Sequence, residues 1–422
     1  MKRIVDLAKR APTTLALWAA VAAISPAQTF TTLYSFCAQS GCPDGNNPYA
    51  VLAQGADGNF YGTTEGGGPN GWGTVFQITP SGSELTILHS FSSCDSGCPN
   101  GNYPEAGLVL ATNGNFYGTT FESGNGLGTV FTMTPGGKLT TLSELCEEGP
   151  CPEGGVWGQQ PVAPLIQATN GDLYGTTQTG PNGGGTVFKI TPAGTLTILY
   201  TFCSQGSQDP CPSGSTPVAP LVQAANGDLY GTTELGGNAC DPADQGCGTV
   251  FRITPSGNLT TLHRFCRSGA VNCPDGKYPT AGLAQGSDGN FYGTTSAFGP
   301  GEAGTVFKMT ATGELTTLYS FCSQPNCADG SEPVAGLVVG TDGNFYGTTV
   351  YGGVNNTSCN SAPGCGTVFK ITPGVLTTVY SFCSQPGCAD GSFPSEGSCK
   401  ALMGASTEPR ATVVSALARS LA

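Results

Sequence analysis

The sequence predicts an all-β fold, and three observations lead to this prediction. Only 10% of the 422 residues are charged, whereas 65 are glycine and 31 are proline, so tight turns are favoured over long helices. Valine, phenylalanine, tyrosine and threonine gather in short runs, and such β-branched and aromatic residues favour strands. The chain also repeats itself about six times, so one small unit of structure accounts for most of it. The same composition excludes a long coiled coil and a collagen triple helix.

Three short motifs define the repeat, which has a period of about 54 to 62 residues. The motif YGTT begins at Tyr61, Tyr117, Tyr174, Tyr230, Tyr292 and Tyr346. The motif GTVF begins at Gly73, Gly128, Gly185, Gly248, Gly304 and Gly366. A third element of the form LTTLYSF ends at Phe36, Phe91, Leu145, Phe202, Phe265, Phe321 and Phe382. Residues that recur in this way are expected to form the core between units, because each unit buries the same faces.

Each unit contains four candidate strands. In the first unit these strands are residues 50–54, 59–64, 74–79 and 85–91. Asp57-Gly58 joins the first two, and Asp-Gly or Asn-Gly recurs there in the other units, as a tight hairpin with positive φ requires. A short Thr-Pro-x-Gly turn joins most of the third and fourth strands. Four short antiparallel strands repeated about six times predict a β-propeller of four-stranded blades.

The repeat domain is expected to span residues 28–397. Its six complete repeats occupy about residues 48–91, 104–146, 161–203, 217–266, 279–322 and 333–383. Residues 29–36 (TFTTLYSF) match the fourth strand of a unit but have no first three strands before them. This spare N-terminal strand leaves two arrangements open, a six-fold ring or an open arc of seven blades. Either arrangement exposes a strand edge.

The repeated units carry a family resemblance. Their form is P-x-A-G-L-V-x-x-x-D-G-N-F-Y-G-T-T followed by G-T-V-F-K-I-T-P-x-G-x-L-T-T-L-Y-S-F, and over about residues 29–397 they resemble the GloVer tandem repeats of bacterial "choice-of-anchor" surface proteins. The resemblance implies an exported, surface-displayed repeat protein and supplies no catalytic residues. The DGN-aromatic-G-T element is also similar to the propeller repeats of periplasmic sensor domains.

Residues 1–27 resemble a secretory signal peptide, with a basic start, the apolar run LALWAAVAAI and small residues before Gln28. The alternative, a membrane anchor, would need about twenty apolar residues. No later segment is long and apolar enough to span a membrane. Cleavage would remove four basic residues and one acidic residue, changing the net charge from −13 to −16. Such a charge repels phosphate groups, so we expect no nucleic-acid partner and a secreted, extracellular or cell-surface location, with the periplasm as the alternative.

Nineteen cysteines in an exported chain predict local disulfides. The expected pairs are Cys37-Cys42, Cys94-Cys98, Cys146-Cys151, Cys203-Cys211, Cys240-Cys247, Cys266-Cys273, Cys322-Cys327, Cys359-Cys365 and Cys383-Cys388. Cys399 is left free. A zinc site would need four ligands, and only His89 and His263 are available to help the cysteines. We therefore expect neither a metal nor a cofactor.

The C-terminal tail, residues 398–422, lacks the repeat pattern. Suitable codons for these residues, regrouped in another frame, can spell V-Q-G-S-D-G-S-F-Y-G-T-T-S-N-G-G-I-G-T-G-T-V-F. We therefore interpret the tail as a frameshifted seventh repeat, with the shift near residues 395–397, which would also explain the odd cysteine. The alternative is a short amphipathic helix. The gene sequence distinguishes the two.

Binding residues are expected on the face that carries the loops between strands 2 and 3 and between strands 4 and 1. Aromatic side chains suited to stacking on a sugar or anchoring a partner lie in these loops at Trp72, Trp157, Phe121, Phe298 and Tyr351. Acidic residues that follow the second strand lie at Glu65, Glu122 and Glu234. The alternative is that each aromatic packs on its own loop and each acid is merely solvated.

The sequence favours a non-catalytic module that binds an extracellular glycan or protein. No nucleophile elbow or phosphate loop is present, and His89 and His263 replace the tyrosine of LYSF, so no catalytic residue is assigned. One alternative is a propeller polysaccharide lyase or glycoside hydrolase, which convergent acids with raised pKa values would favour. Another is a purely structural surface array, which the lack of a pocket would favour.

Overall fold

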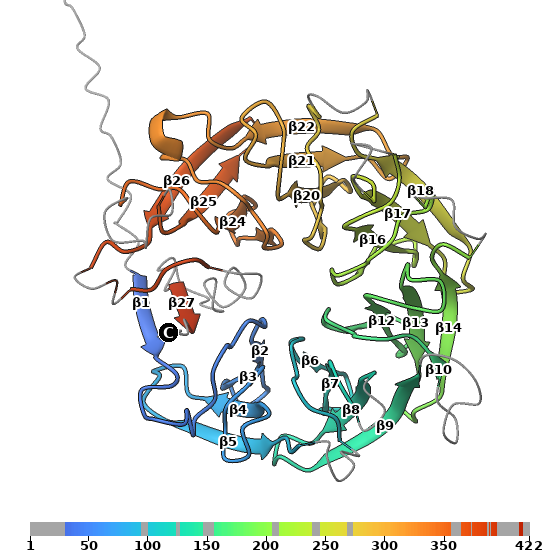
Figure 1. Ribbon diagram of the computed structural model, residues 1–422, viewed down its shortest axis with the longest axis vertical. Coiled ribbons are helices and arrows are strands. Elements are labelled where there is room, and N and C mark those ends of the chain that lie inside the picture. The colour runs from blue at the N-terminus through green and yellow to red at the C-terminus, as the bar shows by residue number, and fades with distance from the viewer. Residues whose placement is uncertain are drawn as a thin grey trace, which may run out of the picture.

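The computed structural model describes residues 30–93, 100–123, 127–146, 156–204, 211–238, 245–267, 273–355, 364–372, 374–385, 388, 390–394 and 413–416. Within these ranges the chain forms six antiparallel four-stranded blades arranged in a ring, with an additional N-terminal strand (Figure 1). The predicted all-β propeller of six complete repeats is therefore confirmed. Among the described residues, no helix has the length and apolar character needed to cross a membrane.

The blades follow one another in chain order. Blade 1 consists of β2 (Ala53–Gln54), β3 (Phe60–Thr64), β4 (Thr74–Ile78) and β5 (Leu85–Ser90). Blade 2 consists of β6 (Val109–Leu110), β7 (Phe116–Thr120), β8 (Thr129–Met133) and β9 (Leu139–Cys146), with β10 (Val156–Trp157) added parallel to β9. Blade 3 consists of β11 (Ile166–Gln167), β12 (Leu173–Thr177), β13 (Thr186–Ile190) and β14 (Leu196–Thr201).

The second half of the ring repeats this order. Blade 4 consists of β15 (Val222–Gln223), β16 (Leu229–Thr233), β17 (Thr249–Ile253) and β18 (Leu259–Arg264). Blade 5 consists of β19 (Ala284–Gln285), β20 (Phe291–Thr295), β21 (Thr305–Met309) and β22 (Leu315–Ser320), and the short helix η1 (Pro325–Cys327) follows it. Blade 6 consists of β23 (Val338–Val339), β24 (Phe345–Thr349), β25 (Thr367–Thr372) and β26 (Val375–Ser381).

The innermost strands are shorter than the sequence predicts. Residues 50–54 were expected to form a strand, but β2 contains only Ala53 and Gln54. At the start of the corresponding segment in blade 2, the carbonyl of Ala106 accepts a hydrogen bond of 3.0 Å from Thr63 Oγ1 of blade 1. The segment of blade 2 therefore bonds to the neighbouring blade at its start and pairs with its own second strand at Val109 and Leu110.

The Asp-Gly turns are hairpins, as predicted. Gly58 adopts a φ of +82°, which disfavours a side chain at this position, and its N–H donates to the Gly55 carbonyl. Asp57 accepts hydrogen bonds from the Asn59 backbone and, at 2.9 Å, from the Tyr61 hydroxyl. The hairpin thus holds the tyrosine of YGTT at the start of the second strand.

Contacts between successive blades repeat around the ring. The Tyr61 ring lies 4.2 Å from the Phe116 ring of the next blade, and Tyr230 stacks on Phe291 at 4.1 Å. These tyrosines and phenylalanines are fully buried. The YGTT and GTVF motifs therefore form the core between blades, as expected from their recurrence.

Disulfides clasp the loops that follow the fourth strands. The structure contains Cys37-Cys42, Cys203-Cys211, Cys266-Cys273, Cys322-Cys327 and Cys383-Cys388. Cys247 and Cys365 are also in disulfides, and their expected partners, Cys240 and Cys359, lie outside the described residues, as do the Cys94-Cys98 pair, Cys151 and Cys399.

A buried aspartate organises each of several clasped loops. Asp329 is fully buried and accepts hydrogen bonds from the Tyr319 hydroxyl at 2.7 Å and from the Ser323 backbone at 3.0 Å. In blade 4 His263 replaces the tyrosine, and its Nε2 lies 2.9 Å from Asp275. His263 therefore takes over the tyrosine's structural contact, in agreement with its interpretation as a strand substitution.

The additional strand β1 (Phe30–Tyr34) lies between blade 6 and blade 1 and pairs in parallel with β27 (Val413–Ala416) (Figure 1). Apart from β27, the tail 398–422 lies outside the described residues, so its frameshift origin stays a prediction. The proposed signal peptide, residues 1–27, also lies outside them.

Candidate ligand-binding site

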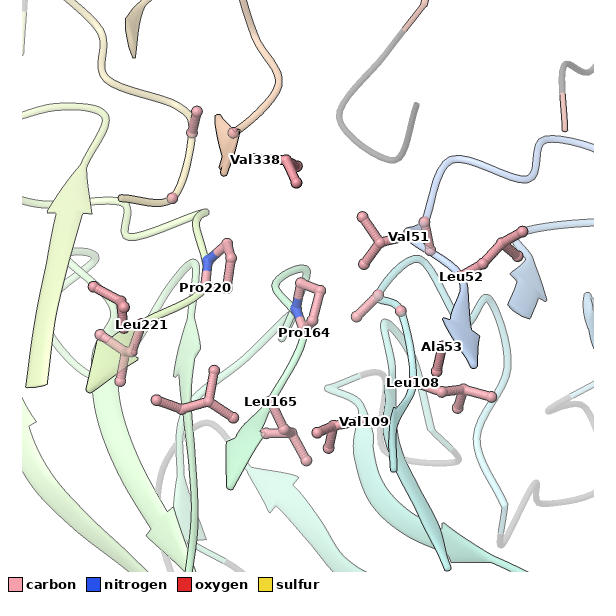
Figure 2. Close-up of a pocket in the computed structure, with 18 of the residues that line it drawn as sticks. Val51, Leu52, Ala53, Leu108, Val109, Pro164, Leu165, Pro220, Leu221 and Val338 are labelled. Carbon is pink, nitrogen blue, oxygen red and sulfur yellow. The ribbon is translucent and has the colours of Figure 1, made fainter. Parts of the chain in front are cut away.

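The first strands of all six blades surround a central cavity of about 920 Å³ (Figure 2). Val51, Pro164 and Pro220 line it from blades 1, 3 and 4. Glycines such as Gly336 occupy the same repeat position in the other three blades and leave the cavity wide. A cavity of this volume is large enough for a small ligand or for the side chains of a bound peptide.

The cavity wall is mainly hydrocarbon, and its polar groups lie near its two ends. Gln54 and Gln167 stand where the inner strands end, and their amide nitrogens donate to the turn carbonyls of Gly58 and Gly171. Tyr49 and Glu105 stand where the inner segments begin, which is the loop face. Glu105 is the one charged residue in the described lining of the cavity.

Glu105 belongs to a group of three carboxylates. Burial raises its pKa to about 7, and the charges of Glu65 and Glu122 contribute to this rise. The pKa of Tyr49, whose side chain is partly exposed, is raised by partial burial first and then by the charges of Glu65 and Glu105. Glu65 and Glu122 follow the second strands of blades 1 and 2, so the carboxylates meet where these two blades adjoin.

Aromatic rings border the same carboxylates. The Trp72 ring lies 5.2 Å from the Tyr103 ring in an edge-on arrangement, and the Tyr103 N–H donates to the Trp72 carbonyl. Burial raises the pKa of Tyr103, and the charges of Glu122 and Glu65 add to this effect. We call Tyr49, Glu65, Trp72, Tyr103, Glu105 and Glu122 the acidic mouth. Carboxylates beside aromatic faces suit a cationic group.

The structure thus brings together three predicted site residues, Trp72, Glu65 and Glu122. Asn47 Nδ2 donates to Glu65 at 3.0 Å and orients that carboxylate. The sequence prediction missed Tyr49, Tyr103 and Glu105. Two of them could have been found from the sequence, because Tyr49 and Glu105 are departures from the repeat at the variable position of the P-x-A segment in blades 1 and 2.

The other predicted residues lie elsewhere on the loop face. The Phe298 ring packs under Lys277, whose Nζ is 4.0 Å from the ring centre. The Tyr351 ring contacts Phe393 at 5.6 Å. The Phe121 N–H donates to the Tyr103 carbonyl, beside the acidic mouth. These contacts give Phe298 and Tyr351 structural partners in neighbouring loops, because Lys277 precedes β19 and Phe393 follows β26, and their role in binding stays a prediction.

Two further predicted residues are separate from the mouth. Glu234 follows the second strand of blade 4, and burial raises the pKa of its carboxyl. Trp157 lies in β10, beside Cys146 of β9. The predicted acids therefore do not form one ring of equivalent groups. Glu65 and Glu122 lie near each other and near Glu105 where blades 1 and 2 adjoin, whereas Glu234 lies in blade 4 and burial is the cause of its raised pKa.

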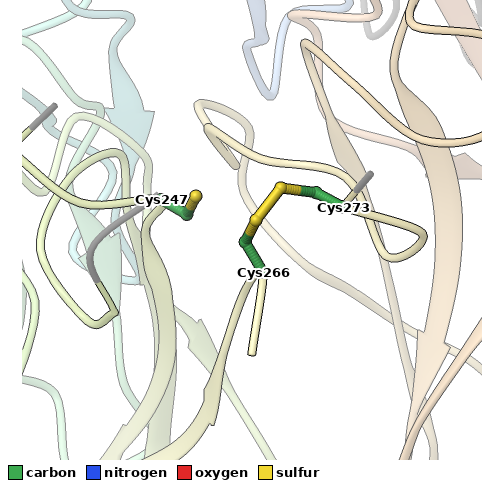
Figure 3. A group of neighbouring side chains, drawn as sticks. All are labelled: Cys247, Cys266 and Cys273. Atoms are coloured by element: carbon green, nitrogen blue, oxygen red, sulfur yellow. A yellow bond between two sulfur atoms is a disulfide. The ribbon is translucent and has the colours of Figure 1, made fainter. Parts of the chain in front are cut away.

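Among the residues that the structure describes, two groups of three cysteines have sulfur atoms within 4.8 Å of one another. One consists of Cys247 beside the Cys266-Cys273 disulfide (Figure 3), and the other of Cys365, Cys383 and Cys388. All six cysteines are in disulfides. Zinc binds thiolates, so we assign no metal site to these sulfur atoms.

These features define a disulfide-clasped propeller of tandem repeats with an acidic, aromatic mouth over an apolar cavity. The Gloeobacter/Verrucomicrobia repeat family matches residues 18–241 and 207–407. The chain therefore belongs to this family, which confirms the resemblance to GloVer repeats. The disulfides and the family are consistent with an extracellular or periplasmic protein.

No curated protein matches the sequence. Among solved structures, a protein named "putative 6-phosphogluconolactonase" from Bacteroides uniformis is similar, with 16% identity, a TM-score of 0.47 and coverage of 82% of this chain and 87% of that chain. TolB from Acinetobacter baumannii has 11% identity, a TM-score of 0.38 and coverage of 72% and 57%. No activity is carried over from these distant structures.

Proposed function

We propose that this protein is a non-catalytic binding module that holds an extracellular protein ligand on its loop face. The observation that carries the proposal is the acidic mouth above the apolar cavity. The described lining offers one charged residue, Glu105, and otherwise mostly hydrocarbon. A ligand that presents an apolar side chain beside a basic one fits both parts of this site.

The charges of the site favour a basic ligand. A lysine or arginine placed between Glu65, Glu105 and Glu122 would offset their mutual repulsion. The faces of Trp72 and Tyr103 offer additional attraction for a cation. The net charge of −13 also steers basic partners towards the protein. Glycans suit the site less well, because their hydroxyl groups need more hydrogen-bond partners than this wall supplies.

The hydrolase or lyase alternative receives one supporting feature, the raised pKa of Glu105. A general acid in a glycosidase has this property, but it works with a second carboxyl across the scissile bond and with polar groups that hold the sugar. Glu105 faces a cavity lined by groups such as Val51 and Leu108. This apolar surrounding supports binding over hydrolysis. The cavity itself argues against a purely structural array.

The proposal includes export to the cell surface or the surrounding medium. The signal-like residues 1–27 motivate it, and the disulfides require an oxidising compartment. Expressing the full chain with a C-terminal tag and fractionating the cells would test this. Tag found in the cytoplasm with reduced cysteines would contradict it.

The binding proposal is tested by selecting displayed random peptides on the immobilised, oxidised protein. We expect enrichment of peptides with an apolar residue next to lysine or arginine. Gly336→Phe should abolish their binding, because an added side chain enters the cavity, and a Cβ at Gly336 meets its nearest atom at an ordinary 3.4 Å. Ala311→Phe, in an exposed turn, is the matched control and should bind normally.

Two results would contradict the proposal. The first is no enrichment, or enrichment that Gly336→Phe leaves unchanged. The second is selective binding on a glycan array that Gly336→Phe abolishes, which would assign the site to a sugar. Hydrolysis of an array glycan by the wild type, lost in Glu105→Gln, would favour the enzyme alternative.

A further inference from the structure

We propose that the ring has seven blade positions and that the interval between blade 6 and β1 accepts a three-stranded segment with this protein's own repeat pattern. The occupant would supply the first three strands of a seventh blade, and β1 would be its fourth. This inference is independent of the proposed ligand. Contacts on both sides of the interval carry it.

On one side, β1 already occupies the place of a fourth strand. The Phe36 ring is buried and lies 4.9 Å from Phe76 of blade 1. The same pair in later blades, Phe202 with Phe251, is separated by 5.4 Å. Gly82 lies against the Leu33 carbonyl, just as corresponding glycines lie against the preceding blade elsewhere in the ring. Blade 1 therefore contacts β1 as each later blade contacts the blade before it.

On the other side, the chain leaves blade 6 as if another blade followed. The Phe393 N–H donates to the Cys365 carbonyl at 2.9 Å, as the Glu332 N–H does to the Ala303 carbonyl one blade earlier. Pro394 then lies against Gly366, so closely that a Cβ on this glycine would come within 2.6 Å of the proline ring. A proline takes the same position at each earlier junction, as Pro333 does against Gly304. Up to residue 394 the chain therefore makes the same contacts that lead into each earlier blade.

A buried hydroxyl marks the missing contact. The first threonine of YGTT donates to a backbone carbonyl of the next blade, at 3.0 Å for Thr63 to Ala106 and 3.0 Å for Thr232 to Ala281. Thr348 is the equivalent residue of blade 6, is 1% exposed, and its Oγ1 has no hydrogen-bond partner among the described residues. Buried hydroxyl groups rarely stay unpaired, so the site is complete only when a following blade supplies a carbonyl.

The described residues do not build this blade. They place only β1 and β27 in the interval, and β27 runs parallel to β1. In all six blades the third and fourth strands are antiparallel, as for β25 and β26. The occupant that fits has the chemistry of the repeat itself, with an Asp-Gly hairpin, a YGTT strand and a GTVF strand. Suitable codons for residues 398–422, regrouped in another frame, can spell such a segment, as predicted from the sequence.

The first experiment measures the hydroxyl of Thr348 in the full chain. Thr348→Val should leave the midpoint of thermal unfolding unchanged or raise it, because no hydrogen bond is lost. The matched variant Thr232→Val should lower the midpoint by about 1 to 4 °C, because it removes the bond to Ala281. Equal losses in the two variants would show that Thr348 already has an acceptor and would overturn the proposal.

The second experiment supplies the occupant. A synthetic peptide with the sequence of residues 333–372, the first three strands of blade 6, is added to the full chain, and a peptide carrying Tyr346→Ala and Phe369→Ala is the control. We expect one equivalent of the first peptide to bind in native mass spectrometry, to raise the unfolding midpoint and to make Thr348→Val destabilising. A free peptide can fail to fold, so a second variant of the chain carries the segment covalently. In this variant, residues 395–422 are replaced by a copy of residues 334–372.

Two outcomes of the second experiment would overturn the proposal. One is that neither the peptide nor the replacement raises the unfolding midpoint more than the same segment carrying Tyr346→Ala and Phe369→Ala does. The other is a stable dimer in sedimentation that the peptide does not dissociate, which would identify a second copy of the chain as the occupant. Both are distinguishable from failure of the binding proposal, which is read from peptide selection at the cavity.

Discussion

Replacing Glu105 by glutamine tests the electrostatics of the acidic mouth. The carboxyl has an ordinary pKa of 4.5, and its environment in the folded protein raises the pKa to about 7, through burial first and the charges of Glu65 and Glu122 second. The charges of these carboxylates also raise the pKa values of Tyr49 and Tyr103, with burial as the larger cause in both. The Glu105 carboxylate is therefore less favourable in the folded than in the unfolded protein.

The size of this penalty follows from the pKa values. A difference of about 2.5 pH units corresponds to about 3.4 kcal/mol, which is an upper limit. Glu105 is only half-buried, so solvent screening reduces the expected effect to about 1 to 2 kcal/mol. This loss of folding free energy is absent well below pH 4.5, where Glu105 is protonated in both the folded and the unfolded protein. It is complete above pH 7, where Glu105 is ionised in both.

The assay is urea unfolding of the oxidised protein at pH 4, 6 and 8, followed by tryptophan fluorescence. Glu105→Gln should match the wild type at pH 4, apart from a constant difference, and should gain about 1 to 2 kcal/mol relative to it at pH 8. Glu314→Gln, at an exposed position, is the control and should show no pH-dependent gain. A Glu105→Gln difference that stays the same from pH 4 to pH 8 would refute the argument.

Ligand binding, a buried aspartate and a disulfide offer three further measurements. A selected basic peptide should bind about three to ten times more weakly at pH 5.5 than at pH 8 by calorimetry, because Glu105 gains a proton, and an equal change in Glu105→Gln would contradict this. Asp329→Ala should lower the free energy of unfolding in urea by about 2 to 3 kcal/mol, since buried donors lose their acceptor. Replacing Cys322 and Cys327 by serine should cost about 2 kcal/mol in the same assay, and a variant as stable as the oxidised wild type would disprove a stabilising role.

Much of the fold is predictable from the sequence because its determinants are local and repeated. The Asp57-Gly58 dipeptide specifies a hairpin by its backbone geometry, and the burial of Tyr61 follows from its recurrence in every unit. The short inner strands are not predictable in this way. In blade 2 the start of the inner segment bonds to a different blade, since Thr63 donates to Ala106, 43 positions further along the chain.

The candidate site is only partly predictable for the same reason. Trp72, Glu65 and Glu122 are in loops that the topology places on one face, so they can be proposed from the strand order alone. Their proximity to Glu105 depends on how blades 1 and 2 adjoin, and that geometry is set by packing between the blades. The apolar character of the cavity likewise emerges only when six inner strands converge.

Departures from the repeat separate residues that the fold requires from residues that function could require. The position of Glu105 is occupied by valine in blades 3, 4 and 6 and by threonine in blade 5, so the propeller does not need a carboxylate there. A half-buried carboxylate with two like charges nearby is also expected to lower stability above pH 7. A residue that the fold does not need and that is expected to reduce stability is the reason for proposing a ligand at the acidic mouth, and a basic group is the chemistry that would offset its charge.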